Sequence, residues 1–347
     1  MHENSLKDYY FFWLHSCLAL ITIMVILGGY TRLTDSGLSI TEWQLISGIL
    51  PPLNQGAWQE MFLKYQQIPQ YSLKFPDIDL AGFKNIFWLE YIHRVFGRIL
   101  GLVILLPALF FYCQKSLSKS YKKFALLITI LVVLQGTMGW IMVASGLTEN
   151  TSVSHYRLAI HLLIAFIIFA AIAAFIYAKK RQNKTIYIIS NYKSFKKLFY
   201  IFTGLLILQI IYGAYVAGLD AGLIYNNYPM MGEKIYPKEL IVDFAFYKIF
   251  ADPAIVQFIH RGLALLLLIN LAFLWLVIIE NKRHILFCLL LTLSILLTIQ
   301  FALGVLTLVS KVNIHLAVLH QLTALFLFAC NALIFQETKI CNAELSS

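Results

Sequence analysis

EYIHRVFGRILGLVILL, residues 90–106, returns in modified form as VQFIHRGLALLLLI, residues 256–269. Each stretch places a His-Arg pair at the start of a long apolar run. An apolar run of about 20 residues is long enough to cross the hydrocarbon core of a bilayer. Polar groups inside a membrane are costly and usually serve a function. The repeated stretch therefore predicts two membrane helices, each with a functional site near one end.

The composition is that of a polytopic membrane protein. Of the 347 residues, 60% are hydrophobic and only 13% are charged, and the mean hydropathy is +0.76. Such values exclude an ordinary soluble domain. The chain contains eight apolar runs of spanning length, at residues 10–30, 88–112, 122–144, 156–178, 196–218, 254–279, 283–309 and 313–336.

The net charge of +10 follows membrane topology. Lys and Arg crowd the second, fourth and sixth connections between spans, which the positive-inside rule assigns to the cytoplasm. The first and fifth connections mix Lys with Asp and Glu, as expected of the outer side. We therefore expect a lipid bilayer and no nucleic acid as the partner of this charge, with both termini cytoplasmic.

The whole four-span unit is repeated. VLQGTMGWIMVASG (133–146) matches TIQFALGVLTLVSK (298–311), and HYRLAIHLLIAF (155–166) matches IHLAVLHQLTAL (314–325). Units with an even number of spans share one orientation, related by an approximate two-fold axis along the membrane normal. The expected fold is an all-α membrane protein of eight transmembrane helices in two such four-helix bundles.

The two bundles are expected to differ in one connection. We assign residues 1–180 to the N-terminal bundle and residues 181–347 to the C-terminal bundle. The first connection, residues 31–87, is much longer than ordinary helix connections. Loops of that length are usually functional or disordered.

Four of the nine histidines occupy repeat-related positions near the predicted outer ends of even-numbered spans: His93, His161, His260 and His320. Two imidazoles facing each other across a bundle suit the axial ligation of a haem iron. Arg94 and Arg261 directly follow two of these histidines and could pair with the haem propionates.

Other interpretations of the histidines stay open at this point. A single intramembrane histidine often only bonds a neighbouring helix, but four at repeat-related positions favour a cofactor site. Zinc is less well supported, because the chain has no HExxH or paired-cysteine spacing. His155 and His315 are not matched by the repeat, and we interpret them as supporting or interfacial residues.

The differences between the halves indicate where chemistry occurs. Glu90 aligns with Gln257, and Arg98, which we also assign to the cofactor-binding residues, aligns with Leu265. Glu90 precedes His93 by three residues, so the two share a helix face, and a carboxylate there could move protons or stabilise positive charge. The alternative is an ion pair with Arg94, four residues on. We predict that the first bundle is the reactive one.

Three segments of the chain resemble the haem A synthase family: GGYTRLTDSGLSITEW (28–43), ILPPLNQGAWQEMFLKYQQIPQY (49–71) and FKNIFWLEYIHRVFGR (83–98). With the later histidine motifs, the resemblance covers nearly the whole chain. It implies a haem-dependent oxidoreductase of the bacterial inner (cytoplasmic) membrane. Such an enzyme oxidises a methyl group of haem O to a formyl group by successive hydroxylation, giving the haem A of terminal cytochrome oxidase.

The resemblance also implies roles for individual residues. His260 and His320 would ligate a resident haem b, while His93 and His161 would mark the site of haem O, with Glu90 as the catalytic carboxylate. One branch of the family has a cysteine pair in the first outer loop. Residues 31–87 contain no cysteine, so the chain resembles the other branch, found in proteobacteria and mitochondria.

The implied partners are haem O synthase as haem donor, cytochrome oxidase assembly factors and an unidentified electron donor. The oligomeric state is left open, a homo-oligomer included. Two rival functions remain: a bis-histidine transmembrane cytochrome b that only carries electrons, and a transporter, since parallel repeats also build transporters.

Overall fold

The structure is a computed structural model that describes residues 3–42, 47–147, 151–181, 191–242, 244–278 and 285–344. This part of the chain is nearly all helical, and eight of its helices are long and apolar enough to cross a membrane. They are α1 (Glu3–Leu33), α4 (Leu80–Cys113), α5 (Lys119–Ala144), α6 (His155–Arg181), α7 (Tyr192–Gly218), α10 (Pro253–Ile278), α11 (Ile285–Val309) and α12 (Ile314–Glu344). The predicted all-α class and its eight spans are confirmed. The orientation of the termini stays a prediction.

Several helices extend beyond the apolar runs that revealed them. α4 begins at Leu80, although its apolar run was placed at residues 88–112. The side chain of Asp79 caps this helix by accepting a hydrogen bond of 2.8 Å from the Gly82 amide. Because a cap fixes a helix start whatever the hydropathy that follows, the helix begins before its lipid-facing part. The predicted cytoplasmic residues Lys184, Lys282 and Arg283 lie outside the described ranges.

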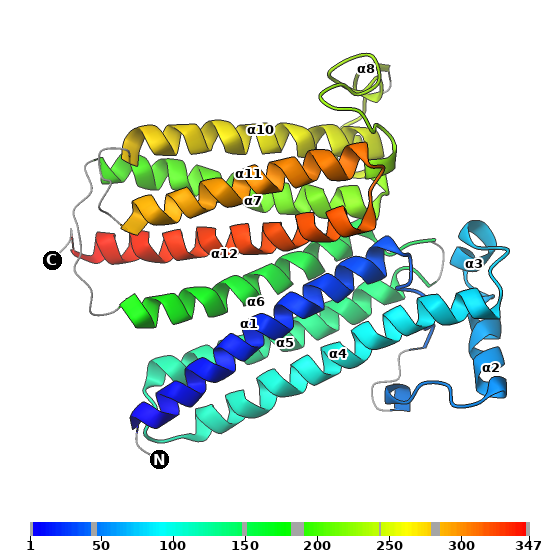
Figure 1. The fold of residues 1–347 in the computed structure, drawn as a ribbon, viewed down its shortest axis with the longest axis horizontal. Coiled ribbons are helices and arrows are strands. Elements are labelled where there is room, and N and C mark those ends of the chain that lie inside the picture. Colours follow the sequence, from blue (N-terminus) through cyan, green and yellow to red (C-terminus); the bar gives the residue numbers. More distant parts are fainter. Residues whose placement is uncertain are drawn as a thin grey trace. The chain divides into compact units, whose positions relative to one another are not determined.

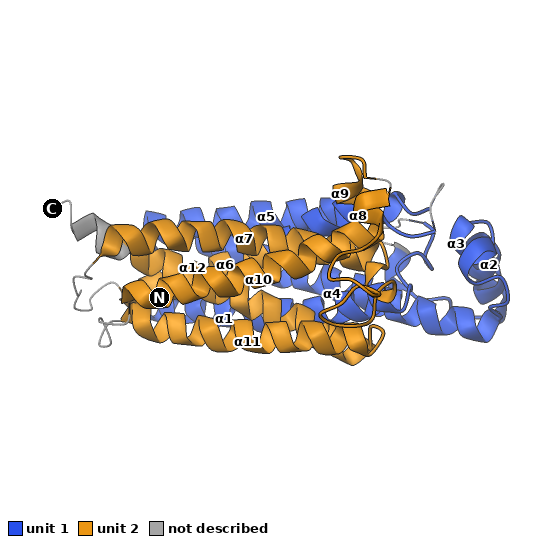
Figure 2. Cartoon of the chain, turned by 90° about the horizontal axis from the view of Figure 1, so that it is seen from above, with its two compact units in different colours: residues 1–165 blue, residues 166–347 orange. Residues whose placement is uncertain are grey.

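The chain forms two compact units, residues 1–165 and 166–347 (Figure 2). In the first unit, α4 packs against α1 and α5 (Figure 1). In the second, α10 packs against α7, and α11 packs against α12. The division lies inside α6, whose residues 155–165 belong to the first unit. The assignment of two functional bundles to residues 1–180 and 181–347 remains a prediction.

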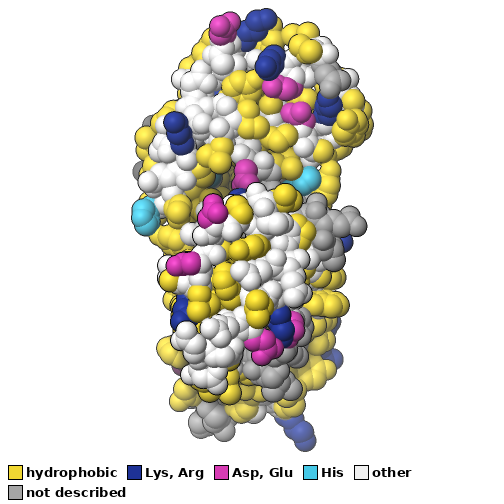
Figure 3. Space-filling view, turned by 90° about the vertical axis from the view of Figure 1, so that its right-hand side faces the viewer, with side chains coloured by type: hydrophobic (Ala, Val, Ile, Leu, Met, Phe, Trp, Pro, Cys, Tyr) yellow, Lys and Arg dark blue, Asp and Glu magenta, His cyan; other side chains and the backbone are white. Residues whose placement is uncertain are grey.

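The long first connection is folded. Between α1 and α4 lie η1 (Ser47–Ile49), α2 (Gln55–Tyr65) and α3 (Pro69–Lys74). Trp58 and Tyr65 of α2 pack with Phe83 and Phe87 of α4 in a buried aromatic cluster, joined by Leu38 and Ile68. The connection is thus anchored on the early turns of α4. Figure 3, which shows the right-hand end of the view in Figure 1, has charged side chains of both signs among hydrophobic and other side chains.

The connection between α7 and α10 in the second unit is also partly helical. It contains η2 (Ala221–Leu223), α8 (Glu239–Val242) and α9 (Lys248–Ala251). Both connections turn away from the preceding span at an aspartate in the left-handed region, Asp35 with φ 53° and Asp220 with φ 51°. Aspartate tolerates this conformation better than most residues, because its short side chain can hydrogen-bond locally.

Candidate functional site

Each of the four predicted histidines lies against a glycine of the preceding span. A Cβ added at the glycine would come within 3.0–3.2 Å of the histidine Cε1, closer than side chains normally approach. The four pairs are Gly28 with His93, Gly139 with His161, Gly213 with His260, and Gly304 with His320. The absence of a side chain at these positions makes the space that each imidazole fills. The glycines therefore seat the histidines.

In the second unit the two histidines face each other at a separation that suits a bound iron. The ring centroids of His260 and His320 are 6.5 Å apart, with an angle of 75° between the planes. Two metal–imidazole bonds of about 2 Å each, together with the half-widths of two rings, give a centroid separation of about 6 Å. The Nδ1 atom of His320 lies 3.1 Å from the backbone oxygen of Gln300, which orients the ring.

The histidines of both units have unsatisfied nitrogens. Within the described part of the chain, the buried Nδ1 atoms of His93, His161 and His260 have no hydrogen-bond partner. Buried polar atoms are nearly always paired in folded proteins, so the unpaired nitrogens set these three rings apart from ordinary core histidines. The described residues contain no group of three or more His, Cys, Asp or Glu that could hold a metal ion. Pairs of histidines fit a haem iron better than zinc, which takes three or four protein ligands.

Glu90 is buried, with 2% of its surface exposed, and both of its oxygens accept hydrogen bonds. The Oε2 atom accepts from the Ser39 hydroxyl at 2.6 Å and the Ile40 amide at 2.9 Å. The Oε1 atom accepts from Nε and Nη2 of Arg94, at 2.9 and 2.6 Å. Four donors thus surround one carboxyl group, and both of its oxygens act as acceptors. The ion pair with Arg94 therefore exists, and it is one part of a larger network.

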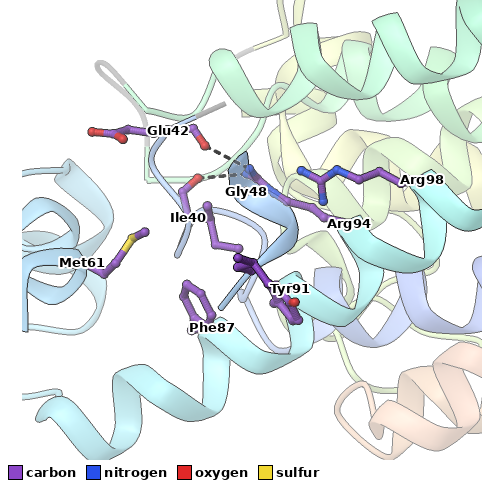
Figure 4. Close-up of a pocket in the computed structure, with 9 residues that line it drawn as sticks. Ile40, Glu42, Gly48, Met61, Phe87, Tyr91, Arg94 and Arg98 are labelled. Atoms are coloured by element: carbon purple, nitrogen blue, oxygen red, sulfur yellow. Dashed lines mark hydrogen bonds between the residues drawn. The ribbon is translucent and has the colours of Figure 1, made fainter. Parts of the chain in front are cut away.

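Arg94 ties α4 to the connection that follows α1. Its Nη2 donates to the Ile40 carbonyl at 2.9 Å and its Nη1 to the Glu42 carbonyl at 3.3 Å (Figure 4). Arg94 also lines a small cavity, together with Tyr91 and with Arg98, which lies one turn further along α4. The cavity volume is about 30 Å³, which admits water but not a porphyrin. Pairing of Arg94 and Arg98 with propionates stays a prediction.

The second unit repeats this network with the opposite polarity at one position. Gln257, also 2% exposed, donates from Nε2 to the carbonyls of Ala221 and Tyr225, at 2.9 and 3.1 Å. Its Oε1 accepts from Nη2 of Arg261 at 3.2 Å. Arg261 also donates to the carbonyls of Tyr225 and Asn227, at 2.8 and 3.1 Å. The two arginines therefore bind their connections in the same way, while Glu90 accepts hydrogen bonds at the position where Gln257 donates them.

Sequence reasoning missed the glutamines that contact three of the histidines. The Nε2 atoms of Gln135, Gln209 and Gln300 lie 3.2, 3.3 and 3.2 Å from the Nε2 atoms of His161, His260 and His320. The signal was present, because each glutamine stands four residues before a seating glycine. His155 is the first residue of α6 and His315 is the second residue of α12, and the interpretation of both as supporting or interfacial residues stays a prediction.

Comparison with known proteins shows resemblance along nearly the whole chain. A family model described as cytochrome oxidase assembly protein matches residues 11–332. The chain is 42% identical to the haem A synthase of Ehrlichia ruminantium (strain Gardel), covering 94% of this chain and 92% of that one. It is 42% identical to the haem A synthase of Pelagibacter ubique (96% and 97%) and 40% identical to that of Rickettsia bellii strain RML369-C (91% and 94%).

Proposed function

Because this chain belongs to the family of cytochrome oxidase assembly proteins that includes the haem A synthases, we propose that it converts haem O to haem A in a bacterial inner membrane. It is an enzyme of haem A biosynthesis with eight candidate membrane spans. The proposed reaction oxidises one methyl group of haem O to a formyl group by successive hydroxylation. Its product serves terminal cytochrome oxidase.

One observation supports this assignment most directly: two histidine pairs with the same glycine seats occur in two units that differ at Glu90 and Gln257. Two similar histidine pairs suit two haem groups, and the difference between Glu90 and Gln257 suits two different roles for these groups. We assign a resident haem b to His260 and His320, and the substrate haem O to His93 and His161. The carboxylate then stands in the unit that binds the substrate.

Bound haem supplies the redox chemistry of this reaction, namely electron transfer and oxidising power at iron. The residues of this chain position the two haem groups and control charge around them. The seated histidines hold the iron, and Arg94, Arg98 and Arg261 lie near them to neutralise propionates. Arg94 and Arg261 already donate to protein oxygens, so a propionate would pair with their charge or replace one of these acceptors.

Glu90 is proposed to act beside the substrate as a fixed negative charge. It precedes His93 by three residues on α4, which places both side chains on one side of the helix. Its four hydrogen-bond donors fix the position of the carboxyl group. A preorganised carboxylate stabilises positive charge that develops nearby in a transition state. Proton transfer is the other role proposed for this carboxyl group.

Haem O synthase is the proposed source of the substrate, and cytochrome oxidase assembly factors are the proposed recipients of the product. The electrons come from a donor that the sequence does not identify. The experiment is to express the full chain with a haem O synthase in a bacterium that makes no haem A, and then to extract the haem groups. We expect haem A or its hydroxylated precursor.

The same extraction tests the rival function, a transmembrane cytochrome b that only carries electrons. The alike histidine pairs of the two units favour that rival as much as the proposed enzyme. If haem b and unchanged haem O are the only haem groups recovered, the chain is a carrier and the proposed function is wrong.

A further inference from the structure

Three of the four helices that seat the histidines share a motif of two residues, spaced four apart. In α5, α7 and α11 the seating glycine is preceded four residues earlier by a glutamine, in the pairs Gln135 and Gly139, Gln209 and Gly213, and Gln300 and Gly304. Residues four apart lie on one face of a helix. The glycine therefore receives the imidazole, and the glutamine amide reaches the Nε2 atom of the same ring.

The helix α1 breaks this pattern. Gly28 seats His93, but the residue four positions earlier is Met24. The Met24 side chain does reach α4, because its Cε lies 3.5 Å from the position that a Cβ on Gly97 would take. A thioether donates no hydrogen bond and accepts only weakly. In the part of the chain that the structure describes, no hydrogen bond to the His93 ring is found, whereas the other three rings are bonded at Nε2.

The Nε2 atom is the nitrogen that His320 offers to iron, and we assign the same nitrogen to the other three rings by the repeat. At His320 the Nδ1 atom lies against the backbone oxygen of Gln300, so the proton belongs on Nδ1 and the lone pair on Nε2. A glutamine amide that donates to Nε2 uses the same lone pair that an iron needs. Iron can bind His161, His260 or His320 only after the amide leaves.

We propose that Met24 keeps the Nε2 atom of His93 open, which makes His93 the ligand that first captures an incoming haem. This inference rests on the proposed function, in which the first unit binds a haem in every catalytic cycle and the second unit binds one that stays. The first unit already has one amide to displace, that of Gln135 at His161, and a second amide at His93 would slow it further. A resident haem displaces its glutamines once. Met24 is thus a positioning residue that adapts the histidine pair of the first unit to the repeated binding and release of haem.

The test is the rate at which the full-length chain takes up added haem. The chain is purified with its resident haem in lipid nanodiscs and mixed with ferric protoporphyrin IX, and the Soret absorbance is followed in time. The phase that disappears in a His93→Ala variant reports binding to the first unit. Met24→Gln supplies the missing amide, so we expect this phase to slow about fivefold, the factor that a net hydrogen bond of typical strength gives.

Two further variants control for packing. Met24→Leu retains an apolar side chain of similar volume and should bind haem at the wild-type rate. Gln135→Met opens the second ligand of the same unit and should leave the rate at least as high as in the wild type. An unchanged resident-haem spectrum shows that each variant is folded.

The possible outcomes separate the inference from the proposed function. Equal rates in Met24→Gln and the wild type, or equal slowing by Met24→Leu, would overturn the role of Met24 and leave the proposed function standing. A wild-type chain that shows no phase dependent on His93 would overturn the assignment of a substrate haem to the first unit, and with it the proposed function.

Discussion

Glu90 and Gln257 show how the exchange of a carboxylate for an amide changes the hydrogen bonds at the same position of two similar networks. The side chains have nearly the same shape and are equally buried. Glu90 only accepts hydrogen bonds, whereas Gln257 donates two and accepts one. An amide at residue 90 would turn an N–H group toward a donor in either orientation, since both oxygens of Glu90 face donors. The exchange is therefore not conservative in either direction.

We predict that Glu90→Gln abolishes haem A formation while the resident haem b remains bound. The substitution removes the negative charge beside the substrate, and its donor–donor contact costs about 1–3 kcal/mol of stability. Haem extraction measures the product, and the reduced optical spectrum measures haem b. Haem A formation at the wild-type rate would reduce Glu90 to an anchor for residues 39 and 40.

The matched control is Gln257→Glu in the second unit. This variant sets a carboxylate against the carbonyls of Ala221 and Tyr225, so it disturbs the fold to a similar degree without touching the proposed substrate unit. We expect lower stability but continued haem A formation by the folded protein. If both variants lose haem A formation in proportion to their loss of folded protein, the Glu90 effect is structural.

The seating glycines give a second prediction at the scale of the residue. In Gly213→Ala the new Cβ would stand 3.1 Å from Cε1 of His260, and this histidine would have to move. We expect much less haem b per chain in the purified variant, measured from its reduced spectrum. Gly204→Ala on the same helix meets nothing within 4 Å and should retain haem b, with a small gain from helix propensity. Equal haem content in the two variants would contradict the seating role.

Among the elements, the connection between α1 and α4 differs most from its expectation. The length of residues 31–87 predicted a functional or disordered loop, yet α2 and α3 fold there on an aromatic cluster. Hydropathy finds spans because a bilayer demands an apolar run of fixed length. It says little about short amphipathic helices, whose stability comes from packing against another element. The capping side chain of Asn54, which accepts from the Ala57 amide, was the local signal for α2.

We predict that Phe83→Ala releases this connection while the membrane helices stay folded. Phe83 is fully buried between Phe62 and Tyr65, at centroid distances of 5.2 Å from each. Loss of a buried aromatic side chain costs about 3–5 kcal/mol. Trypsin should then cut after Lys64 or Lys74 sooner than in the wild type. Leu63→Ala, at a side chain 60% exposed, is the control that should not change the cleavage rate.

At the scale of the whole molecule, the features that could be predicted are those that a bilayer demands and those that an alignment of the two halves reveals. Hydropathy predicted the eight spans, and the repeat predicted the four histidines and the contrast of Glu90 with Gln257. Neither predicted the contacts between spans, such as Gly28 against His93 or the carbonyls that bind Arg94. Those contacts depend on how helices rotate against each other, which no single helix encodes. Packing of small residues decides that rotation in membranes.

The last prediction separates the two units. Each histidine pair lies within one compact unit and has its own glycine seats, so removal of one pair leaves the seats of the other in place. His260→Ala should lose haem b but still bind added haem O, and it should form no haem A because electrons no longer reach the substrate. His93→Ala should retain haem b and lose haem O binding. Extraction and chromatography of the bound haem groups measure both outcomes. Loss of both haem groups in each variant would mean that the pairs form one cooperative site, and the division of roles between the units would have to be abandoned.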